Sequence, residues 1–531
     1  SLPALCLIKE QTRVGPTIGA ENSRAGLISF ACALLLVFVY MVFYYGKAGI
    51  IADVALFANI LFIFGSLASF GAVLTLAGIA GIVLTIGMAV DANVLIFERI
   101  REEQANGKDV KSAIDTGFKK ALSSIIDANV TTLLTAVVLK SFGTGPIESF
   151  ATTLIIGIFT SVFAALVITR LLMLWWMKSG KGINFETKLT KGAFKGLNFN
   201  FVGKRKLYYM ISGVLMAGAL LALFGKGLNP SVEFSGGRSF GVKFENTTTG
   251  HKELVADVLK KEFTDANGKE ASVEIKTKTN SFFLEITTNY LLSNEKNSNE
   301  QVKAALKSGL DKCKPQLGDY SIQESRSVTT KVSDELVSSS MLAIILSLII
   351  IFAYILIRFG RWQYSTGAII AMIHDVLVVL GVFAIFNGIL PFNMDIDQAF
   401  VAAILTVIGY SINDTVVVFD RIREDLTLHK NVNEEEQINK SLNSTLSRTI
   451  NTSMTTFIVL LIVFLFGGAA IKGFIFALMI GVIVGTYSSL CIATPILIDF
   501  SKNKLKEDQD KAILRAEEVA AAKAERDSMV G

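Results

Sequence analysis

Eleven stretches of this chain are long and apolar enough to cross a membrane as single helices. Each holds about 20 or more residues of mostly apolar character, the length that a hydrocarbon core about 30 Å thick requires. The composition agrees, because 51% of the 531 residues are hydrophobic and only 18% are charged, which is too apolar for a soluble protein of this length. The approximate limits are 25–45, 49–69, 71–98, 124–142, 148–177, 207–225, 337–358, 364–388, 398–420, 446–467 and 471–499.

An internal repeat divides these spans into two halves. The sequence GMAVDANVLIFERIRE at 87–102 returns as GYSINDTVVVFDRIRE at 409–424. Both copies run in the same direction, so we interpret the halves as parallel repeats of five matching spans, with 207–225 as an additional span of the second half. By symmetry we expect one more span ahead of the first residue, and twelve spans in the whole protein. Two further pairs of segments align, 58–65 with 374–381 and 122–132 with 446–456.

Basic residues set the predicted orientation of the bundle. The segment 178–206 carries eight Lys or Arg residues against one acid, Glu186. The loops after the two repeated motifs and the charged tail 501–531 fall on the same side when the number of spans is odd. Basic loops remain in the cytoplasm. The sequence therefore predicts a multi-pass membrane protein with Ser1 outside and Gly531 in the cytoplasm.

The long polar segment 226–334 lies between spans and falls on the outer side. Its pattern predicts a β-α-β-β-α-β unit, a ferredoxin-like fold. Residues 4–10 are expected to be the last strand of a second outer domain, most of which is absent from this chain. Whether Cys6 and Cys313 bond is left open by the sequence. The expected strands are 238–245, 272–277, 282–288 and 320–329, and the expected helices are 251–263 and 299–312.

The predicted fold class is thus an all-α membrane bundle of two parallel pseudo-repeats with a small α+β outer domain. The expected division is the end of an outer domain at 1–24, a first membrane half at 25–177, a basic cytoplasmic linker at 178–206, a first span of the second half at 207–225, the ferredoxin-like domain at 226–334, the remaining second half at 335–500 and a cytoplasmic tail at 501–531.

Each copy of the repeated motif places a carboxylate inside an apolar run. Asp91 and Asp414 lie roughly 10–12 Å inside their spans, counted from Arg99 and Arg421 at about 1.5 Å per helical residue. Asp91 aligns with Asn413, so the two acids stand one residue apart in register. Ionisable residues at this depth are costly and mark a functional site.

One cation is available to both acids. Arg448 lies at the inner end of the tenth span, and its counterpart in the first half is Ser124. A carboxyl group in the middle of a membrane favours its neutral form, whereas a neighbouring guanidinium favours the ionised form. An acid that alternates between these environments takes up and releases a proton. We therefore expect Asp91, Asp414 and Arg448 to form a proton pathway.

Other polar residues have two interpretations each. His374 and Asp375, inside the eighth span, are either a proton relay or a contact between helices. The two motif acids could also serve only as polar helix contacts, and the arginine only as an anchor at the cytoplasmic surface. Four residues are either neighbours of the site or helix contacts, namely Asn93, Asn413, Thr415 and Asn451. The charged residues after the motifs are expected to pair at the helix exits, namely Glu98, Arg99, Arg101, Asp420, Arg421 and Arg423.

The motifs resemble those of the SecD and SecF membrane proteins of the bacterial Sec pathway, joined in one polypeptide, and the resemblance spans nearly the whole chain. Gly236-Gly237 of the SecF-like motif are expected to form a turn with positive φ. The segments similar to SecD are GMAVDANVLIFERIREE at 87–103 and GTGPI at 143–147. The segments similar to SecF are IGYSINDTVVVFDRIRE at 408–424, SRTINTSMTT at 447–456, HDV at 374–376 and FSGGRSF at 234–240.

This resemblance implies a branch of the resistance-nodulation-division superfamily, in which proton flow drives movements of outer domains. It implies an accessory of the Sec translocon in the bacterial inner membrane that uses the proton motive force to promote late translocation and release of secreted polypeptides. The implied partners are the SecYEG channel, the SecA motor, other translocon accessories, unfolded secreted polypeptide and membrane lipid. No nucleic acid, cofactor, metal or enzymatic reaction is expected. Two alternatives stay open, an exporter of small molecules or lipids from the same superfamily and a passive scaffold of the translocon.

Overall fold

The computed structural model describes residues 10–72, 75–180, 182–191, 198–264, 271–277, 282–291, 298–429 and 433–501. Within these residues, eleven helical segments are long and apolar enough to cross a membrane, which confirms the number predicted from hydropathy. The helices of the first half are α1 (Pro16–Tyr45), α2 (Lys47–Ser69), α3 (Leu76–Ala105), α4 (Val110–Phe142) and α5 (Pro146–Phe163), which continues through a π-helix η1 (Ala164–Ile168) into α6 (Thr169–Lys178).

The helices of the second half follow the same plan after one additional span. They are α7 (Arg205–Gly225), α11 (Thr330–Phe359), α12 (Trp362–Phe386), α13 (Gln398–Leu428), α14 (Glu434–Phe466) and α15 (Lys472–Ser488). A short 3-10 turn η2 (Ala469–Ile471) precedes α15, and a π-helix η3 (Ser489–Ala493) follows it within one candidate span, Ala469–Ser501.

Several helices extend beyond the predicted spans on the basic side of the bundle. The fourth and tenth spans were expected from 124 and 446, but α4 and α14 begin earlier, at Val110 and Glu434. Their polar first turns are stabilised by N-caps, because Asp109 accepts from the Ser112 amide at 3.2 Å and Asn433 from the Glu435 amide at 3.0 Å. Hydropathy marks the part of a helix that lies in lipid, and it misses these capped extensions.

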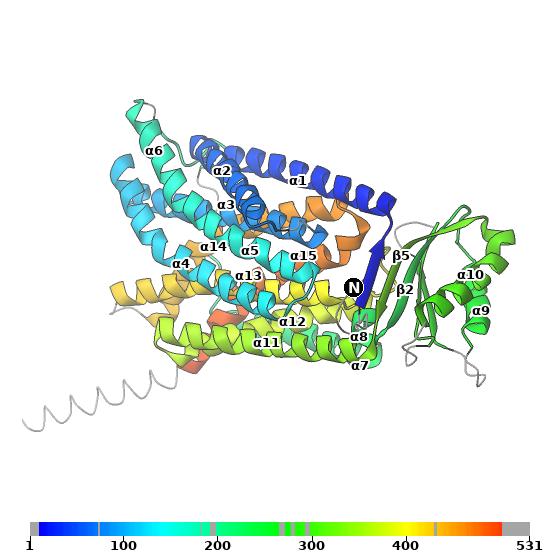
Figure 1. The fold of residues 1–531 in the computed structure, drawn as a ribbon. Helices are drawn as coiled ribbons and strands as arrows, with labels where there is room; N and C mark the ends of the chain where they lie inside the picture. The colour runs from blue at the N-terminus through cyan, green and yellow to red at the C-terminus, as the bar shows by residue number, and fades with distance from the viewer. Residues whose placement is uncertain are drawn as a thin grey trace, which may run out of the picture.

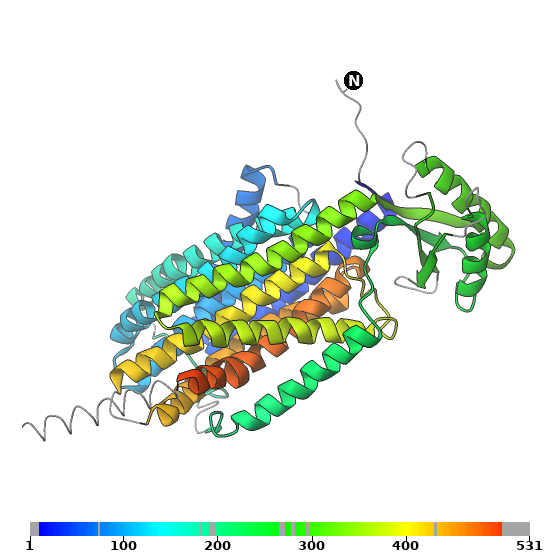
Figure 2. The ribbon, with the colours of Figure 1, turned by 90° about the horizontal axis from the view of Figure 1, so that it is seen from below.

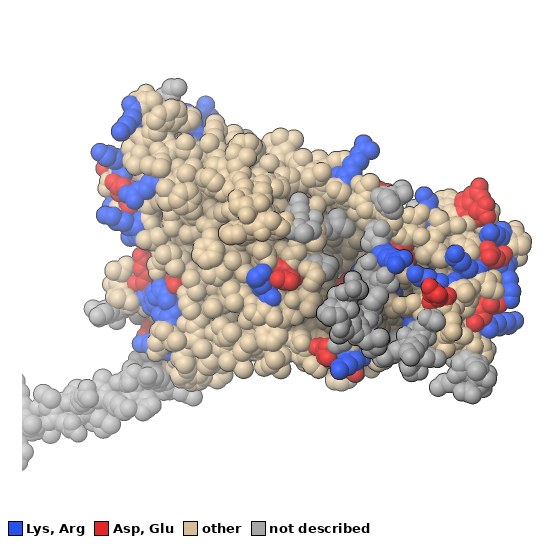
Figure 3. Space-filling view, viewed as in Figure 1, with Lys and Arg blue, Asp and Glu red and all other residues tan. Residues whose placement is uncertain are grey.

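The helices run side by side as one bundle, with a sheet domain at one end (Figures 1 and 2). In the bundle, α3 and α13 are the most deeply buried of the candidate spans. Charged side chains gather at the two ends of the molecule, and the surface between them is mostly uncharged (Figure 3). This distribution is typical of a protein that spans a membrane.

The contacts between helices follow the internal repeat. In each half, the motif helix packs against the two helices that follow it, α3 against α4 and α5, and α13 against α14 and α15. Each motif helix also crosses to the other half, α3 to α14 and α13 to α4. Gly87 lies against Thr456, and Gly409 correspondingly lies against Thr132, whose hydroxyl donates to the Gly409 carbonyl at 3.2 Å. The two halves therefore interlock through equivalent positions.

The sheet domain has the predicted β-α-β-β-α-β order. Its elements are β2 (Gly237–Phe244), α9 (Lys252–Glu262), β3 (Val273–Thr277), β4 (Phe283–Thr288), α10 (Ser298–Leu317) and β5 (Tyr320–Val328). All strand pairs are antiparallel, and the sheet order is β1-β5-β2-β4-β3. The two helices cover one face (Figure 1) and enclose a separate core. Cys313 is free and buried in that core, whereas Cys6 lies outside the described residues.

The N-terminal strand β1 (Glu10–Val14) pairs with β5 and forms the edge of this sheet. The strand expected at 4–10, as the end of a second outer domain, falls almost entirely outside the described residues. Residues 1–9 lie outside the described residues. The first helix α1 begins at Pro16, a residue suited to the first helical turn, ahead of the span expected from 25.

The glycine pair at the start of the sheet domain adopts the predicted backbone. Gly236 and Gly237 have φ angles of 68° and 138°, and a side chain at Gly237 would also come within 3.0 Å of the Thr288 carbonyl oxygen. The pair joins the short helix α8 (Val232–Ser235) to β2.

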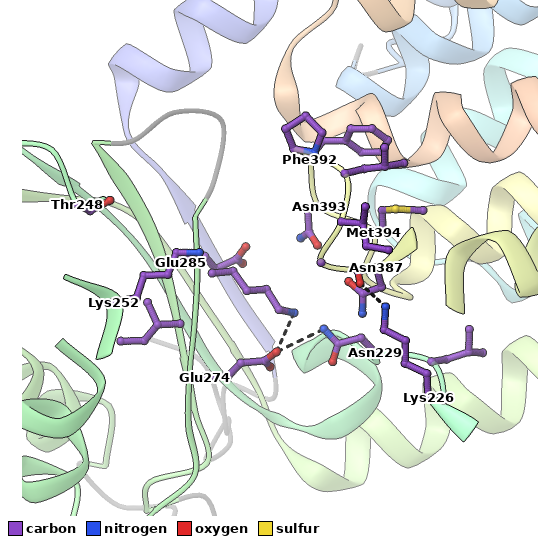
Figure 4. Close-up of a pocket in the computed structure, with 18 of the residues that line it drawn as sticks. Lys226, Asn229, Thr248, Lys252, Glu274, Glu285, Asn387, Phe392, Asn393 and Met394 are labelled. Atoms are coloured by element: carbon purple, nitrogen blue, oxygen red, sulfur yellow. Dashed lines mark hydrogen bonds and ion pairs between the residues drawn. The ribbon is translucent and has the colours of Figure 1, made fainter. Parts of the chain in front are cut away.

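Polar contacts join the sheet domain to the loop that precedes α13. The Ser231 amide donates to the Ile396 carbonyl at 2.9 Å, and the Ile396 amide donates to the Asn229 carbonyl at 2.8 Å. Asp395 accepts from Asn229 at 2.7 Å and pairs with Lys276 of β3 at 2.6 Å. A cavity of about 860 Å³ lies beside this joint, between β3 and the loop (Figure 4).

The first turn of α13 takes part in the same joint. Glu233 of α8 accepts from the Gln398 amide at 2.7 Å and forms an ion pair with Arg326 of β5. Asp397 caps the helix by accepting from the Phe400 amide at 2.7 Å. The start of α13 is therefore fixed to the sheet domain, a contact that hydropathy does not reveal.

We expect Gly381→Ala to lower the melting temperature. The added methyl group would lie 2.3 Å from the Ala219 side chain and 2.6 Å from its Cα atom, so α12 and α7 would have to separate. Overpacking of this kind costs about 1–3 kcal/mol. Gly218→Ala on α7 is the matched control, because no atom lies within 4 Å of its added methyl group. Equal melting temperatures for the two variants in the same lipid would contradict this close packing.

We expect Asp397→Asn to stabilise the protein at neutral and higher pH. Burial, and next the charge of Glu233, raise the pKa of Asp397 from its ordinary 3.8 to about 7. Between about pH 4 and about pH 7 the folded protein keeps a proton that the unfolded chain has lost, so the free energy of unfolding falls as the pH rises. Asparagine at position 397 can still cap the helix. Because it has no ionisable group, the variant should not lose free energy of unfolding as the pH rises.

The measurement is the melting temperature of variant and parent across that pH range. The variant should melt higher above about pH 7, and the difference should vanish below about pH 4. Asp319→Asn, at a side chain that is 84% exposed, is the control. A difference that does not change with pH would contradict the prediction.

Candidate functional site

The structure brings Asp91, Asp414 and Arg448 together in the middle of the bundle. They come from α3, α13 and α14 and are 7%, 1% and 4% exposed. The Nη2 atom of Arg448 lies 3.3 Å from Oδ1 of Asp91, and its Nη1 atom lies 3.6 Å from Oδ1 of Asp414. One guanidinium thus lies between two carboxyl groups that are more than 300 residues apart in the sequence.

Neutral side chains complete the surroundings of the two acids. The amide of Asn413 donates to Oδ2 of Asp91 at 2.8 Å. Ser453 lies 3.5 Å from Oδ2 of Asp414, and its hydroxyl also shares a hydrogen bond of 2.6 Å with Thr486 of α15. Asp91 is therefore held by two polar partners, whereas the contacts of Asp414 are longer.

The charges at this site do not balance when both acids are ionised. Two carboxylates and one guanidinium leave one net negative charge in a buried place, which is costly. One proton on either acid makes the group neutral. Two nitrogens of Arg448, Nε and Nη1, have no hydrogen-bond partner among the described residues. The pairing is thus incomplete, and the site is short of one positive charge.

Two cavities meet at Arg448. A cavity of about 20 Å³ beside Asp91 and Asn413 is large enough for a single water molecule. A second cavity, of about 460 Å³, lies among the charged residues at the ends of α3 and α13, including Glu102 and Arg421. Leu95 and Arg448 line both. These two side chains therefore separate the acid beside the small cavity from the wide cavity at the basic end.

Reciprocal ion pairs join the two motif helices at that end. Arg99 of α3 pairs with Glu424 of α13 at 2.7 Å, and Arg421 of α13 pairs with Glu102 of α3 at 2.5 Å. Within each helix, Arg101 pairs with Glu98 at 2.8 Å and Arg423 with Asp420 at 2.6 Å. The charged residues after the motifs form the ion pairs that the sequence predicted at the helix exits.

Three of the expected neighbours do not contact the acids. Asn93 accepts from Thr169 at 2.8 Å, because two residues along a helix turn its side chain about 200° away from Asp91. Thr415 donates to a carbonyl of its own helix, and Asn451 accepts from Tyr40 of α1 at 2.8 Å. Among the four candidate neighbours, Asn413 is the one that contacts an acid.

His374 and Asp375 form a cluster apart from the central acids. Oδ1 of Asp375 lies 3.0 Å from Nδ1 of His374, and Oδ2 accepts from Ser411 of α13 at 2.5 Å and from Ser488 of α15 at 2.7 Å. These contacts join three helices of the second half. They agree with the interpretation as a contact between helices, and they leave the relay interpretation open.

Sequence reasoning did not single out Asp127 of α4. This carboxylate is 5% exposed and pairs with Arg358 of α11 at 2.6 Å, and Tyr354 donates to it at 2.8 Å. Nearby, Ser124, the counterpart of Arg448, donates to Asp420 at 2.7 Å. The available signal was an acid inside a predicted span.

Comparisons with known proteins agree with these features. The family described as "Protein export membrane protein SecD/SecF, C-terminal" matches residues 5–179 and 308–503, and the "SecD/SecF GG Motif" matches residues 221–248. The SecDF protein translocase subunit of Brucella abortus is 36% identical over 97% of this chain and 65% of its own length. That of Bacillus subtilis is 31% identical over 96% of this chain and 68% of its own length.

A solved structure shares the fold. The crystal structure of SecDF from Thermus thermophilus, described as a translocon-associated membrane protein, superimposes with a TM-score of 0.82 at 32% identity. The match covers 93% of this chain and 64% of that one. The chain thus spans about two thirds of the length of such relatives. It is a multi-pass membrane protein and belongs to the SecD/SecF family of protein-export membrane proteins, as a chain that joins SecD-like and SecF-like parts.

Proposed function

We propose that this chain is the membrane part of a proton-driven accessory subunit of the Sec translocon, which promotes late translocation and release of secreted polypeptides on the outer side. The observation that supports this proposal most strongly is the place of Arg448 between Asp91 and Asp414. That group lacks one positive charge and becomes neutral when a single proton binds.

The proton acts as a switch between two pairings of the guanidinium. When Asp414 is protonated, Arg448 pairs with Asp91 alone, and when Asp91 is protonated, it pairs with Asp414. Because the three side chains belong to three helices, each change of partner favours a different placement of α3, α13 and α14. A membrane potential supplies about 2.3 kcal/mol per charge per 100 mV to drive the cycle.

The wide cavity gives the proton a route to one side. It opens among charged groups at the basic, cytoplasmic end and reaches Arg448. In this arrangement the wide cavity ends at Leu95 and Arg448, next to the small cavity that holds Asp91, and exchange with the outer side requires a second arrangement. Alternating access of this kind prevents a continuous leak.

Movement of α13 reaches the outer side through its first turn. Asp414 lies in the middle of this helix, and the Gln398 amide at its start donates to Glu233 of the sheet domain. A shift of α13 along its axis therefore displaces the sheet domain, which lies on the outer, periplasmic side in the proposed orientation. The substrate in this proposal is an unfolded polypeptide that leaves SecYEG after SecA has inserted it.

We expect Asp91→Asn and Asp414→Asn to abolish release of a secreted protein that depends on the proton gradient. The reason is that an amide cannot exchange the proton that resets the pairing of Arg448. The measurement uses inverted membrane vesicles with the full-length protein, after insertion driven by ATP has been stopped. Asp115→Asn is the control, because its side chain is 46% exposed and lies outside the central site.

The two alternatives predict different outcomes of this experiment. A passive scaffold exports normally with either substitution, so normal release would contradict the proton-driven proposal. Arg448→Leu leaves two acids without a cation and should also abolish release. An exporter of small molecules or lipids would lose transport of those compounds in the same variants while release of the secreted protein stayed unchanged.

We further expect Glu233→Gln to separate proton flux from export. The substitution removes the ion pair to Arg326 and weakens the acceptor of the Gln398 amide, so α13 moves with less displacement of the sheet domain. In liposomes with the full-length protein, proton flux should persist while release falls about tenfold or more, a coupling loss of about 1.4 kcal/mol. Glu300→Gln on α10 is the control. Equal loss of flux and release would contradict this role.

A further inference from the structure

The cluster around His374 is a deeply buried polar group outside the central site. His374, Asp375 and Ser411 are each 1% exposed, and Ser488 is fully buried. The Asp375 carboxylate accepts from two hydroxyl groups on Oδ2 and contacts the imidazole through Oδ1. An ionised carboxylate only accepts hydrogen bonds. With Asp375 ionised, Nδ1 of His374 therefore carries the hydrogen of this contact.

The other ring nitrogen has no partner. Nε2 of His374 is buried and makes no hydrogen bond within the described part of the chain. With Nδ1 as donor, the Nε2 lone pair of a neutral imidazole stays free. A buried polar atom without a partner is costly, and a proton bound at Nε2 would use this free lone pair.

The internal repeat provides a built-in comparison. The positions that align with His374, Asp375 and Ser411 in the first half are Ala58, Asn59 and Ala89. The same helix framework therefore forms without an ionisable pair at this place. Asn59 itself is buried, and neither its oxygen nor its nitrogen has a partner among the described residues. The framework accordingly does not require the His–Asp pair.

The charges of this cluster respond to one proton. A neutral imidazole beside ionised Asp375 leaves one net negative charge, and no Lys or Arg of the described residues pairs with that carboxylate. A proton on Nε2 converts the pair to imidazolium and carboxylate, which together are neutral. The proton leaves from the same atom, and no bond other than the N–H bond is made or broken.

The helices around the cluster contribute few other titratable groups. From α15, Tyr487 places its ring 6.1 Å from that of His374, and its hydroxyl bonds to Ser212 and the Tyr208 carbonyl of α7. Cys491 comes from η3. On α13, Asp414 lies one helical turn beyond Ser411. In α11, which packs against α12, the buried positions between 343 and 355 are Ala343, Ser347, Ile351 and Ile355, none of which titrates.

We infer that His374, held by Asp375, is a second proton-binding site of the membrane bundle. This inference rests on the proposed function and adds a station to it. The hydrogen bond from the Ser411 hydroxyl to Asp375 links the charge state of this pair to α13, the helix that carries Asp414. The hydrogen bond from Ser488 links it to α15. Loading of Nε2 removes the net charge of the pair and weakens the acceptor strength of Asp375 toward both hydroxyl groups. The second site therefore biases the placement of α13.

The first test observes the proton directly. This chain contains three histidines, so ¹⁵N labelling of histidine in lipid vesicles gives few signals, and His374→Gln identifies the one in question. The samples span about pH 9 to about pH 5, and if Nε2 binds a proton we expect the signal to change from neutral imidazole to imidazolium as the pH is lowered. A signal that keeps one form across this range would overturn the inference.

The second test separates proton binding from packing. Glutamine at 374 can still donate to Asp375 but cannot carry a proton, so proton flux of the full-length protein in liposomes should fall about tenfold or more. A double variant with His374→Ala and Asp375→Asn carries the residues that the first half has at these positions, so it should fold. Its proton flux should fall as much as that of His374→Gln. Ser365→Ala, at a fully buried serine of α12, is the control for a changed helix surface.

The outcomes distinguish this inference from the proposed function. Normal flux in His374→Gln together with lost flux in Asp414→Asn would overturn the second site and leave the proposed function intact. Normal flux in Asp414→Asn would contradict the proposed function itself. If proton flux were lost in the double variant with His374→Ala and Asp375→Asn but normal in His374→Gln, residue 374 would act only as a hydrogen-bond donor. That outcome would overturn the inference.

Discussion

One guanidinium between two buried carboxyl groups is the interaction on which the rest of the bundle depends. Arg448 can neutralise one of Asp91 and Asp414 but not both, and in a low-dielectric interior the remaining charge costs several kcal/mol unless a proton or water offsets it. The site must therefore be enclosed by close helix packing and yet stay within reach of water. The burial of α3 and α13 meets the first demand, and the cavities that meet at Arg448 meet the second.

The pseudo-symmetry of the two halves explains how such a site is built, and its departures from symmetry explain what the site can do. Equivalent positions interlock, as with Gly87 and Gly409, and the ion pairs of Arg99 and Arg421 are reciprocal. The polar residues of the two halves differ, because the first half has Ser124 at the position where the second half has Arg448. A fully symmetric site with two arginines and two acids would be neutral without a proton. Because the second arginine is missing, the site lacks one positive charge, and an exchangeable cation such as a proton can supply it.

Features encoded by local sequence could be predicted, and features that depend on the third dimension could not. The spans and the order of strands and helices follow from hydropathy and periodicity, and an acid in an apolar run identified Asp91 and Asp414. The direction in which the Asn93 side chain points depends on how α3 is rotated relative to its neighbouring helices, and the sequence alone does not place those helices. The capped extension of α4 is local but too polar for hydropathy to mark, whereas the pairing of Asp127 with Arg358 depends on a contact between distant segments. The pairing of β1 with β5 likewise needed the tertiary structure.

In the proposed mechanism, the energy supplied by a proton limits the size of the movement. One proton at 100 mV supplies about 2.3 kcal/mol, comparable to two ordinary hydrogen bonds at about 1 kcal/mol each and far below the cost of unpacking a helix interface. The proton can therefore shift α13 only by exchanging a few polar contacts. Asp414, Ser411 and the Gln398 amide all lie on this helix, and the first and last are about 24 Å apart at 1.5 Å per residue. A rigid helix carries a small displacement over that length undiminished, so in the proposed mechanism the contact of Glu233 with its first turn is where a change of proton partner becomes a movement outside the membrane.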